Sequence, residues 1–385
     1  MDERTRLIRG ATRRPDKRRV VNPPIERGTT LLNTSAADLR DANLGPTYGI
    51  EGLAVHRALE EAVAELEVAK HVFLAPTGLA AVTIAATACL RPGDEALVSD
   101  AAYGPTRRFF ERRLKRWGVA TRFYPAAGDA GTILGLASEK TKLIHIESPG
   151  SVTFDMVDVP ALASAARSRG MASLTDSTWA AGVFFKPLAH GVDLSVQALS
   201  KYAGGHSDVF LGSIATNDAT LAKRVGDLIE DDGWYVSPDD CWLALRGMRT
   251  LPLRLAEHER NARCVSEWLE SQPEVEQVLW PALPSHPGHE IWKRDYTGAS
   301  GLMGVVLTPG TQQRAEAMLD ALELFGLGYS WGGFESLATF ESPQLTRRVH
   351  QQPVAGPLLR LHIGLEAADD LIADLRRGLD VYADG

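Results

Sequence analysis

Residues 71–99 read HVFLAPTGLAAVTIAATACLRPGDEALVS, and this stretch decides the fold class. Its first five residues are mostly apolar and predict a strand. Thr77-Gly78 then opens an apolar stretch that predicts a helix to about Leu90, which Arg91-Pro92-Gly93-Asp94 ends. Ala96–Ser99 predicts the next strand. A strand, a helix and a second strand in this order are typical of a unit whose two strands run parallel.

The same alternation continues over the next hundred residues. Helices are expected at Pro105–Arg116 and Pro160–Arg169, and strands at Val119–Tyr124, Leu143–Glu147, Ala172–Thr175 and Val192–Leu199. The pattern predicts an α/β fold with a mostly parallel sheet that is covered by helices on both faces. Right-handed crossovers bring the C-terminal ends of parallel strands to one edge, where ligands bind in such sheets.

After about residue 250 the pattern changes to that of a smaller α/β unit. We expect one long helix of mixed charge, then strands and helices in turn, at Leu253–Ser271, Val275–Leu279, Gly304–Leu307, Gln312–Leu322, Leu358–Ile363 and Ala367–Leu379. Residues 1–50 are too rich in Pro and Gly to fold alone. The chain is therefore divided into an N-terminal arm (1–50), a first α/β domain (51–250) and a C-terminal α/β domain (251–385).

Composition narrows the class of protein. The 385 residues are 44% hydrophobic and 23% charged, as in an ordinary soluble protein, and the net charge is −8. This acidic balance argues against nucleic acid as the main partner. Residues 1–27 are the exception, with nine Lys/Arg against four acidic residues. Two interpretations stay open for this segment, an arm that binds nucleic acid and, favoured, a solvated arm that lies on a partner subunit.

The sequence also favours a cytoplasmic location without a membrane partner. The first residues are charged, and the longest nearly apolar run, Leu79–Leu90, has 12 residues. About 20 are needed to span a bilayer, and no signal peptide is visible. Cys89, Cys241 and Cys264 are widely spaced, which is typical of reduced thiols.

A lysine follows one of the expected strands of the first domain. Val192–Leu199 runs into Ser200-Lys201-Tyr202, and Gly204-Gly205 comes soon after. A lysine in this position is partly buried, and desolvation lowers the pKa of its amine, which suits the formation of a Schiff base. The alternative is a lysine that extends to solvent along an apolar stem.

An aspartate at a neighbouring strand end supports the first interpretation. Asp176 follows Ala172–Thr175, and its strand is expected to lie close to that of Lys201. A pyridine ring whose aldehyde joins the lysine could place its nitrogen against this carboxylate. An ionised aspartate there keeps the ring nitrogen protonated, which makes pyridoxal 5′-phosphate (PLP) an electron sink. A capping or salt-bridged aspartate is the alternative.

Other residues of the sequence suit the remaining parts of such a site. Thr77-Gly78-Leu79 lies between a strand and a helix, where free N–H groups attract a phosphate, and Ser200 could add a hydroxyl. Tyr103 could stack on a cofactor ring or be an ordinary core residue. Arg360 is a charge inside an apolar strand, and its partner is either a substrate carboxylate or an internal acid. No metal site is expected, because the two histidines of residues 286–289 have no further ligands.

Beyond these separate signals, the chain from about Val21 onward resembles the Cys/Met-metabolism PLP-dependent enzymes. The resemblance depends on ordered pieces of sequence: ESPGS at 147–151, DSTWAAG at 176–182, SKY at 200–202, GHSD at 205–208, PALP at 281–284, WKRD at 292–295, YSWGG at 329–333 and RLHIGLE at 360–366. Trp179 and Trp331 are similar to the β-lyase branch rather than to the γ-acting relatives.

The resemblance implies the aspartate-aminotransferase-like fold (PLP fold type I), usually as a tetramer of two close dimers, with PLP bound in the 51–250 domain. It implies that Lys201 holds PLP, that Asp176 meets the ring nitrogen and that Tyr103 stacks on the ring and assists proton transfer. It further implies that the phosphate is held by Gly78, Leu79 and Ser200. Tyr48 would reach the phosphate in the neighbouring subunit's site. The substrate would be contacted by Arg360, Ser330 and Trp331.

The resemblance further implies β-elimination of cystathionine or another cysteine S-conjugate, with the freed Lys201 amine as the base that takes the Cα proton. The products would be pyruvate, ammonia and a thiol. Two alternatives stay open: γ-elimination or sulfhydrylation by an enzyme of the same family, and a regulator with this fold that does not catalyse.

Three positions depart from the family pattern. Ile50 stands where the family usually has an arginine for the phosphate, Ser177 where it has Asn and Ala198 where many members have Ser. Arg57 is the candidate to compensate for the missing arginine. We expect PLP to bind more weakly to this chain than to an Ile50→Arg variant.

Overall fold

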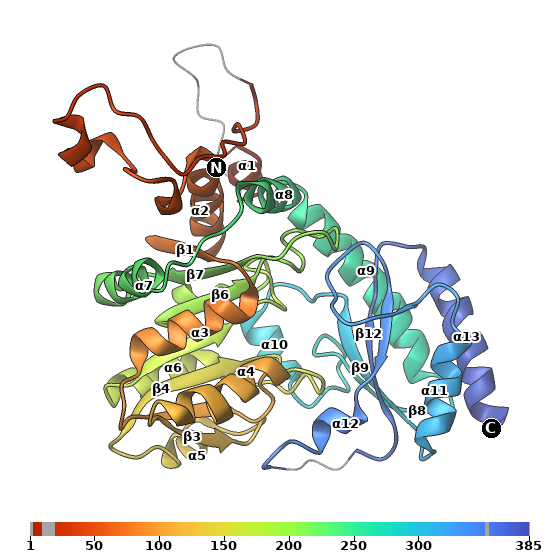
Figure 1. Cartoon of the computed structure of the whole chain (residues 1–385). Coiled ribbons are helices and arrows are strands. Elements are labelled where there is room, and N and C mark those ends of the chain that lie inside the picture. The colour runs from red at the N-terminus through yellow and green to blue at the C-terminus, as the bar shows by residue number, and fades with distance from the viewer. Residues whose placement is uncertain (1–2, 10–19, 351–353, 385) are drawn as a thin grey trace.

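The computed structural model describes residues 3–9, 20–350 and 354–384, which form two β-sheets with helices packed around them (Figure 1). The first sheet has seven strands in the order β1-β7-β6-β5-β4-β2-β3. Their bounds are β1 His71–Ala75, β2 Glu95–Ser99, β3 Ala120–Tyr124, β4 Thr141–Glu147, β5 Ala172–Asp176, β6 Leu194–Ala198 and β7 Gly212–Thr216.

This sheet is mostly parallel, which confirms the predicted fold class. Strands β6, β5, β4, β2 and β3 pair in parallel, while β7 pairs antiparallel with both β6 and β1. Strand β7 was not predicted, because it follows β6 after a loop, without the crossover helix by which parallel strands are recognised. Its residues are all buried.

Both faces of the first sheet are buried, as the apolar strands predict. Along β2, Ala96 and Val98 join one apolar cluster and Leu97 joins the other, because successive side chains point to opposite faces. The helices over the Ala96 face are α3 (Gly78–Cys89), α4 (Gly104–Arg108) with the π-helical turn η4 (Phe109–Leu114), and α7 (Ala219–Asp231). Those on the Leu97 side include α2 (Ala54–Glu67), α5 (Ala130–Gly135) and α6 (Val159–Ser168).

The second sheet has five strands in the order β10-β11-β12-β9-β8. Their bounds are β8 Val275–Leu279, β9 Leu302–Leu307, β10 Gly326–Leu327, β11 Leu337–Phe340 and β12 Leu358–His362. The other elements of this part are α9 Leu251–Glu270, α10 His289–Asp295, α11 Gln312–Asp320, α12 Ser342–Leu345 and α13 Ala368–Asp384. The short elements β10, β11, α10 and α12 were not predicted, whereas the other elements of this part lie within a few residues of their expected positions.

The long helix α9 links the two sheets. Helix α8 (Pro238–Met248) packs on α2, and α9 follows it directly and packs on β8 and α13 of the second sheet (Figure 1). His258 of α9 contacts the carbonyl of Ile363 through Nδ1 at 2.8 Å, just after β12. The division of the chain at residues 50 and 250 stays a prediction.

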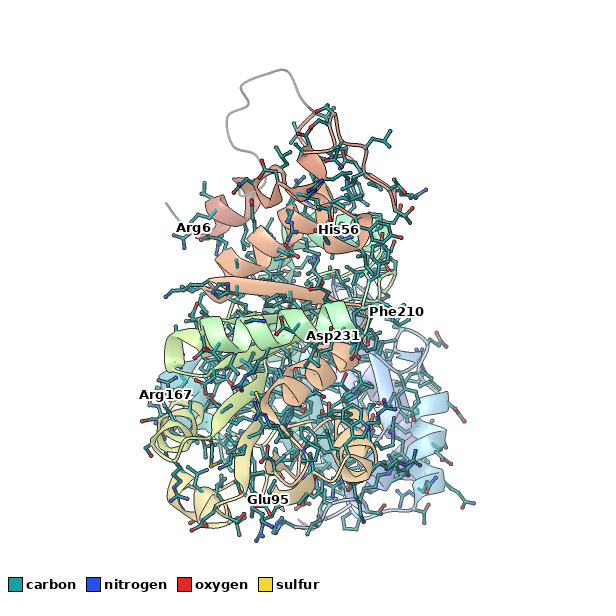
Figure 2. All side chains as sticks on the ribbon, turned by 60° about the vertical axis from the view of Figure 1, so that its left-hand side comes forward. Arg6, His56, Glu95, Arg167, Phe210 and Asp231 are labelled. Atoms are coloured by element: carbon teal, nitrogen blue, oxygen red, sulfur yellow. The ribbon has the colours of Figure 1, made fainter. Side chains whose placement is uncertain are left out.

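The N-terminal arm is less irregular than its composition suggests. Residues Glu3–Arg9 form helix α1, which packs on α2 and buries Leu7. Figure 2 shows Arg6 and His56 at this end of the molecule and Glu95 at the opposite end. Part of the basic segment discussed above, residues 10–19, lies outside the described residues. In the part of the chain that the structure covers, no helix is long and apolar enough to cross a membrane.

Candidate active site

The predicted polar strand ends lie together at one edge of the first sheet. Glu147 ends β4 and Asp176 ends β5, and the two residues are partners in the parallel register. Strand β6 pairs with β5 on its other side and leads into the turn that carries Lys201. Neighbouring strands lie about 4.8 Å apart, so this topology places two carboxyl groups and an amine within one small region.

The Lys201 amine lies beside one polar and one aromatic side chain. Its Nζ donates a hydrogen bond to Ser330 Oγ at 2.6 Å and lies 5.5 Å from the centre of the Trp331 ring. Burial lowers the pKa of Lys201 to about 8, the positive charge of Arg360 acts in the same direction, and Asp176 opposes both. The amine is therefore neutral in an appreciable fraction of molecules near pH 7, which is what a nucleophile or base requires.

Asp176 presents one carboxylate oxygen toward the site. Its Oδ1 accepts hydrogen bonds from the Thr178 amide at 3.0 Å and the Thr178 hydroxyl at 2.5 Å. Its Oδ2 accepts none from the residues that the structure describes. Burial raises the pKa of Asp176, whereas the two bonds from Thr178 and the charge of Lys201 favour the ionised form. Thr178 also accepts the Ala198 amide at 2.9 Å and so ties the end of β5 to β6.

Glu147 is a residue whose role the sequence did not reveal. Its Oε2 accepts the Tyr103 amide at 2.8 Å, and its Oε1 accepts the Ser151 hydroxyl at 2.6 Å. Burial and the neighbouring Asp176 raise the pKa of Glu147 to about 8. Because the positive charge of Lys201 acts on Asp176 and favours its ionised form, Glu147 holds the proton of this pair at neutral pH.

Tyr103 lies at the rim of the same region. It precedes α4, its amide is fixed by Glu147, and 47% of its surface is exposed. Burial raises the pKa of Tyr103, as do the nearby Asp176 and Glu147. The phenol is therefore protonated at neutral pH and can donate a hydrogen bond. Its half-exposed ring is available for stacking.

The N-terminus of α3, the predicted phosphate site, packs closely against the end of β6. Thr77 caps the helix by accepting the Ala80 amide at 3.0 Å, while the Gly78 and Leu79 amides donate to none of the described residues. A Cβ at position 78 would lie 2.5 Å from the Cβ of Ala198, so only glycine fits. The predicted phosphate ligand Ser200 has its hydroxyl bonded to the carbonyl and the amide of Leu211, at 3.1 and 2.9 Å.

Tyr48 lies elsewhere on this chain, in the N-terminal arm. It lines a cavity of about 400 Å³ together with Arg27, Ile50 and Tyr235, and the other predicted site residues are absent from that lining. Ile50 is 44% exposed there. Arg57, the expected substitute for the missing arginine, is bonded to the Glu51 carbonyl at 2.9 Å and to Glu60 at 3.0 Å.

The second sheet contributes Arg360 to the site. Arg360 lies in β12, its side chain is 12% exposed, and its Nη1 lies 3.6 Å from Oε1 of the buried Glu341. Its Nη2 donates to the Ser330 carbonyl at 3.4 Å. Both contacts are long, and burial lowers the pKa of Arg360 while Glu341 opposes this effect. From the sequence, the partner of Arg360 is either a substrate carboxylate or an internal acid. The structure shows an internal acid, Glu341, at a long distance, so guanidinium N–H groups of Arg360 are left for a further partner.

The loop that carries Ser330 and Trp331 is anchored by a buried histidine. Gly332 donates its amide to His362 Nε2 at 2.9 Å, so Nδ1 carries the proton and donates to the Glu335 carbonyl at 3.0 Å. Burial lowers the pKa of His362 well below its usual value, which keeps Nε2 an acceptor. Gly332 packs directly on the backbone of Lys201, where a Cβ would lie 3.1 Å from Cα. Neither Glu341 nor His362 had been assigned a role from sequence.

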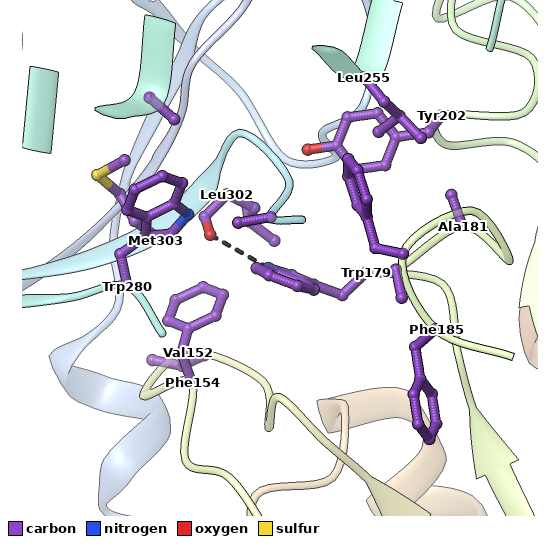
Figure 3. Close-up of a cluster of buried hydrophobic side chains, with 14 of the residues drawn as sticks. Val152, Phe154, Trp179, Ala181, Phe185, Tyr202, Leu255, Trp280, Leu302 and Met303 are labelled. Carbon is purple, nitrogen blue, oxygen red and sulfur yellow. Dashed lines mark hydrogen bonds between the residues drawn. The ribbon is translucent and has the colours of Figure 1, made fainter. Parts of the chain in front are cut away.

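The two sheets are also joined behind the site. Trp179 follows Asp176 and donates its indole N–H to the Leu302 carbonyl, at the start of β9, at 3.2 Å (Figure 3). Figure 3 shows Trp179 among Val152, Phe154 and Tyr202 in the apolar cluster between the sheets. This packing explains why a tryptophan follows the Asp-Ser-Thr sequence.

The residues present fit PLP. An amine of lowered pKa, a carboxylate with one unused oxygen, a half-exposed aromatic ring and a glycine at a helix N-terminus match the aldehyde, the ring nitrogen, the ring face and the phosphate of this cofactor. No group of three His, Cys, Asp or Glu side chains suited to a metal ion occurs among the described residues.

Comparison with known proteins agrees with this chemistry. The sequence model of the family described as "Cys/Met metabolism PLP-dependent enzyme" matches residues 4–380. The chain belongs to this family. The predicted family, PLP as cofactor and the assignment as an enzyme are thereby confirmed.

Members of the family with different activities are similar to this chain. Cystathionine beta-lyase of Bordetella avium is 44% identical over 368 residues, which cover 94% of this chain and 92% of that protein. Cystathionine gamma-lyase of Mus musculus is 36% identical and covers 91% of this chain and 89% of its own. The crystal structure of cystathionine gamma synthase from Xanthomonas oryzae pv. oryzae, with aminoacrylate and cysteine, has a TM-score of 0.93 at 32% identity and covers 100% and 99%. PLP fold type I is confirmed by this likeness.

Proposed function

We propose that the protein is a PLP-dependent carbon–sulfur lyase that converts cystathionine and water to homocysteine, pyruvate and ammonia by β-elimination. The observation that carries the proposal is the Lys201 amine, whose pKa is lowered to about 8 and whose Nζ lies beside Ser330 and Trp331, at a sheet edge shared with Asp176. The similarity to beta-lyases over nearly the whole chain supports β- rather than γ-elimination.

PLP, when bound through Lys201, supplies an electron sink for the charge that develops at the substrate Cα. Asp176, whose carboxylate is held by Thr178, would accept the N–H of the ring nitrogen and so keep that nitrogen protonated. The Lys201 amine would take the Cα proton of the substrate, and its lowered pKa suits a base that works near neutral pH. A proton donor near the substrate sulfur would assist the departure of the β-thiolate.

The residues around Lys201 orient the substrate. Arg360 has guanidinium donors beyond its long contact with Glu341, and these bind the α-carboxylate. Ser330 Oγ, which accepts a hydrogen bond from Lys201 Nζ at 2.6 Å, positions the amine, and the Trp331 ring lies beside it. Tyr103 remains protonated and so provides a proton for the departing thiolate.

We propose further that the enzyme is a cytoplasmic homotetramer. The arm before α2 carries large apolar side chains that are largely exposed on a single chain, among them Leu32 at 94% and Leu44 at 61%. Exposed apolar side chains of this size favour coverage by a partner subunit. Tyr48, on the same arm, would then reach the phosphate in the neighbouring site.

The second candidate is γ-elimination, because the gamma-lyase from mouse is 36% identical to the chain. Incubation of the purified holoenzyme with L-cystathionine distinguishes the two. β-Elimination gives pyruvate and homocysteine, whereas γ-elimination gives 2-oxobutyrate and cysteine. We expect pyruvate; 2-oxobutyrate as the main keto acid would overturn the proposal in favour of the second candidate.

A further inference from the structure

A segment that follows β11 of the second sheet is docked on the C-terminal edge of the first sheet. This segment, residues 341–350, includes α12, and we call it the strap (Figure 1). Asp100, directly after β2, accepts the amides of Val349 and His350 at 3.1 and 2.6 Å. The His350 ring donates from Nε2 to the Phe123 carbonyl of β3 at 3.1 Å. The end of the strap is therefore tied to two strands of the first sheet.

Arg348 ties the strap to the turn after β4 as well. Its side chain is buried, and its Nη2 donates to the Ser151 carbonyl at 3.1 Å and to Thr153 Oγ1 at 2.6 Å. Its Nη1 lies 3.5 Å from Oδ2 of Asp155. The adjacent Arg347 is exposed. A buried guanidinium that bonds to another segment of the chain in this way stabilises the docking of the two segments.

The other end of the strap is the acid beside Arg360. Glu341 accepts the Thr339 hydroxyl through Oε1 at 2.7 Å, and its Oε2 accepts Nε2 of Gln344 in α12. The Arg360 Nη1 lies 3.6 Å from the same Oε1, which is too long for a hydrogen bond. Each oxygen of this buried carboxylate thus has a hydrogen-bond donor other than Arg360.

The separation of Glu341 and Arg360 determines how many guanidinium donors a substrate can use. A short bidentate pair between them would occupy two of these donors and offset the positive charge. The bond from Gln344 draws the carboxylate toward α12 instead. Because α12 is part of the strap, its position depends on the contacts that Asp100 and Arg348 make at the other end.

We infer that Arg348 is a positioning residue that, through the strap, holds Glu341 away from Arg360. The Arg360 guanidinium thereby stays available to the α-carboxylate of the substrate. The inference rests on the proposed function, in which Arg360 binds this carboxylate. Without Arg348 the strap loosens, Glu341 closes on Arg360, and the internal carboxylate competes with the substrate.

The test measures KM and kcat of the holoenzyme for L-cystathionine and S-ethyl-L-cysteine from the keto acid formed. The two substrates share the α-carboxylate and differ in the leaving thiol. We expect Arg348→Gln to raise KM about fivefold for both substrates and to change kcat by less than about twofold. Arg347→Gln, at the exposed neighbour on the strap, is the matched control and should leave both constants unchanged.

A double variant distinguishes positioning from a general loss of structure. Glu341→Gln combined with Arg348→Gln removes the competing carboxylate, so KM should return to within about twofold of the wild-type value. Hydrogen exchange provides a measurement that does not depend on activity. The amides of Val349 and His350 should exchange faster in Arg348→Gln than in Arg347→Gln, because their bonds to the first sheet are weakened.

Several results would overturn the role of Arg348 while pyruvate formed by the wild type still supports the proposed function. They are an unchanged KM, an effect on one substrate alone, unchanged exchange of the strap amides, and a double variant with the KM of Arg348→Gln. If Arg348→Gln does not retain its cofactor absorbance, Gln344→Ala takes its place. This partly buried side chain bonds to Glu341, so an unchanged KM in that variant would overturn the inference equally.

Failure of the proposed function would give a different result. A wild-type holoenzyme that forms a keto acid from neither substrate would overturn the proposed function and the inference with it. Formation of 2-oxobutyrate from cystathionine would overturn β-elimination alone, because both reactions bind the α-carboxylate, and the KM comparison would still test Arg348.

Discussion

The two sheets contribute to the active site in different ways. In the first sheet, Glu147 and Asp176 are register partners at the ends of adjacent parallel strands, and Lys201 follows the next strand. In the second sheet, Arg360 lies within a strand, and its contacts, Ser330 and Glu341, come from loops on either side of β11. In the proposed function, the first group acts on the cofactor and the second group binds the substrate. In that proposal, the strand order of the first sheet positions the groups that carry out the reaction, and packing between distant segments of the second sheet positions the group that binds the substrate.

This difference implies that substitutions in the two regions should affect different kinetic constants. Loss of a group at the edge of the first sheet should lower kcat, because it removes a group that acts in the transition state. Loss of a group of the second sheet should mainly raise KM. The predictions below test this comparison, from the largest expected effect to the smallest.

The largest effect is expected for Lys201→Ala. The variant lacks both the amine that holds the cofactor and the base that takes the Cα proton, so we expect pyruvate formation to fall about 10⁴-fold or more. The visible absorbance of the bound cofactor should also be lost. Full lyase activity in this variant would end the assignment of Lys201.

Asp176→Asn should give the next largest loss. An amide at this position cannot stabilise a protonated ring nitrogen, so we expect kcat to fall about 100-fold, with KM changed much less. Steady-state kinetics with L-cystathionine would measure both constants. A rise in KM alone would contradict the division of roles between the two sheets.

The pH dependence of cofactor capture tests the environment of Lys201. Only the neutral amine attacks an aldehyde, and burial lowers the pKa of Lys201 to about 8. For the cofactor-free protein, the rate of PLP capture should rise about 50-fold between pH 6 and pH 8 and level off above pH 9. A rate that continues to rise beyond pH 10 would show a lysine of ordinary pKa.

Arg360→Gln represents the second sheet in this comparison. The substitution removes the charged donors for the α-carboxylate, so we expect KM for cystathionine to rise about 30-fold, with kcat reduced much less. Glu341→Gln removes the carboxylate that lies near the Arg360 guanidinium, so KM for cystathionine should stay unchanged or fall. Opposite signs for these two variants would be hard to obtain from general destabilisation.

The smallest effect is expected for Glu147→Gln, the register partner of Asp176. Because its raised pKa of about 8 keeps Glu147 protonated at pH 7, a neutral amide should change kcat there by less than about threefold. Above pH 8 the wild type gains a second negative charge beside Asp176, and the variant does not. The variant should therefore lose less activity than the wild type between pH 8 and pH 9. Identical pH profiles would contradict the protonated state assigned to Glu147.

The features that could be predicted from the sequence belong mainly to the first sheet. Strand–helix alternation predicted the parallel sheet, and strand ends share an edge in any such sheet, so Asp176 and Lys201 could be placed together before the structure was known. Strand β7 was missed, because no crossover helix marks it. Glu341 and His362 were missed as well, because their roles depend on packing against β12 and against the Gly332 loop, which no local pattern encodes.

The site itself stays a prediction in its details. The family and the cofactor are confirmed by comparison, and the structure brings Lys201, Asp176, Tyr103, Ser330, Trp331 and Arg360 into one region. Ser200 is placed near the α3 N-terminus, with its hydroxyl already bonded to Leu211. Tyr48 lies on the arm, and a role for it depends on the proposed tetramer.

The central claim is that PLP is linked to the ε-nitrogen of Lys201, and its most direct test is chemical. Holoenzyme would be reduced with borohydride, digested and analysed by mass spectrometry. We predict a pyridoxyl phosphate adduct on the peptide that contains Lys201 and on no other peptide. An adduct on a different lysine, or none in protein that retains its cofactor, would contradict the account.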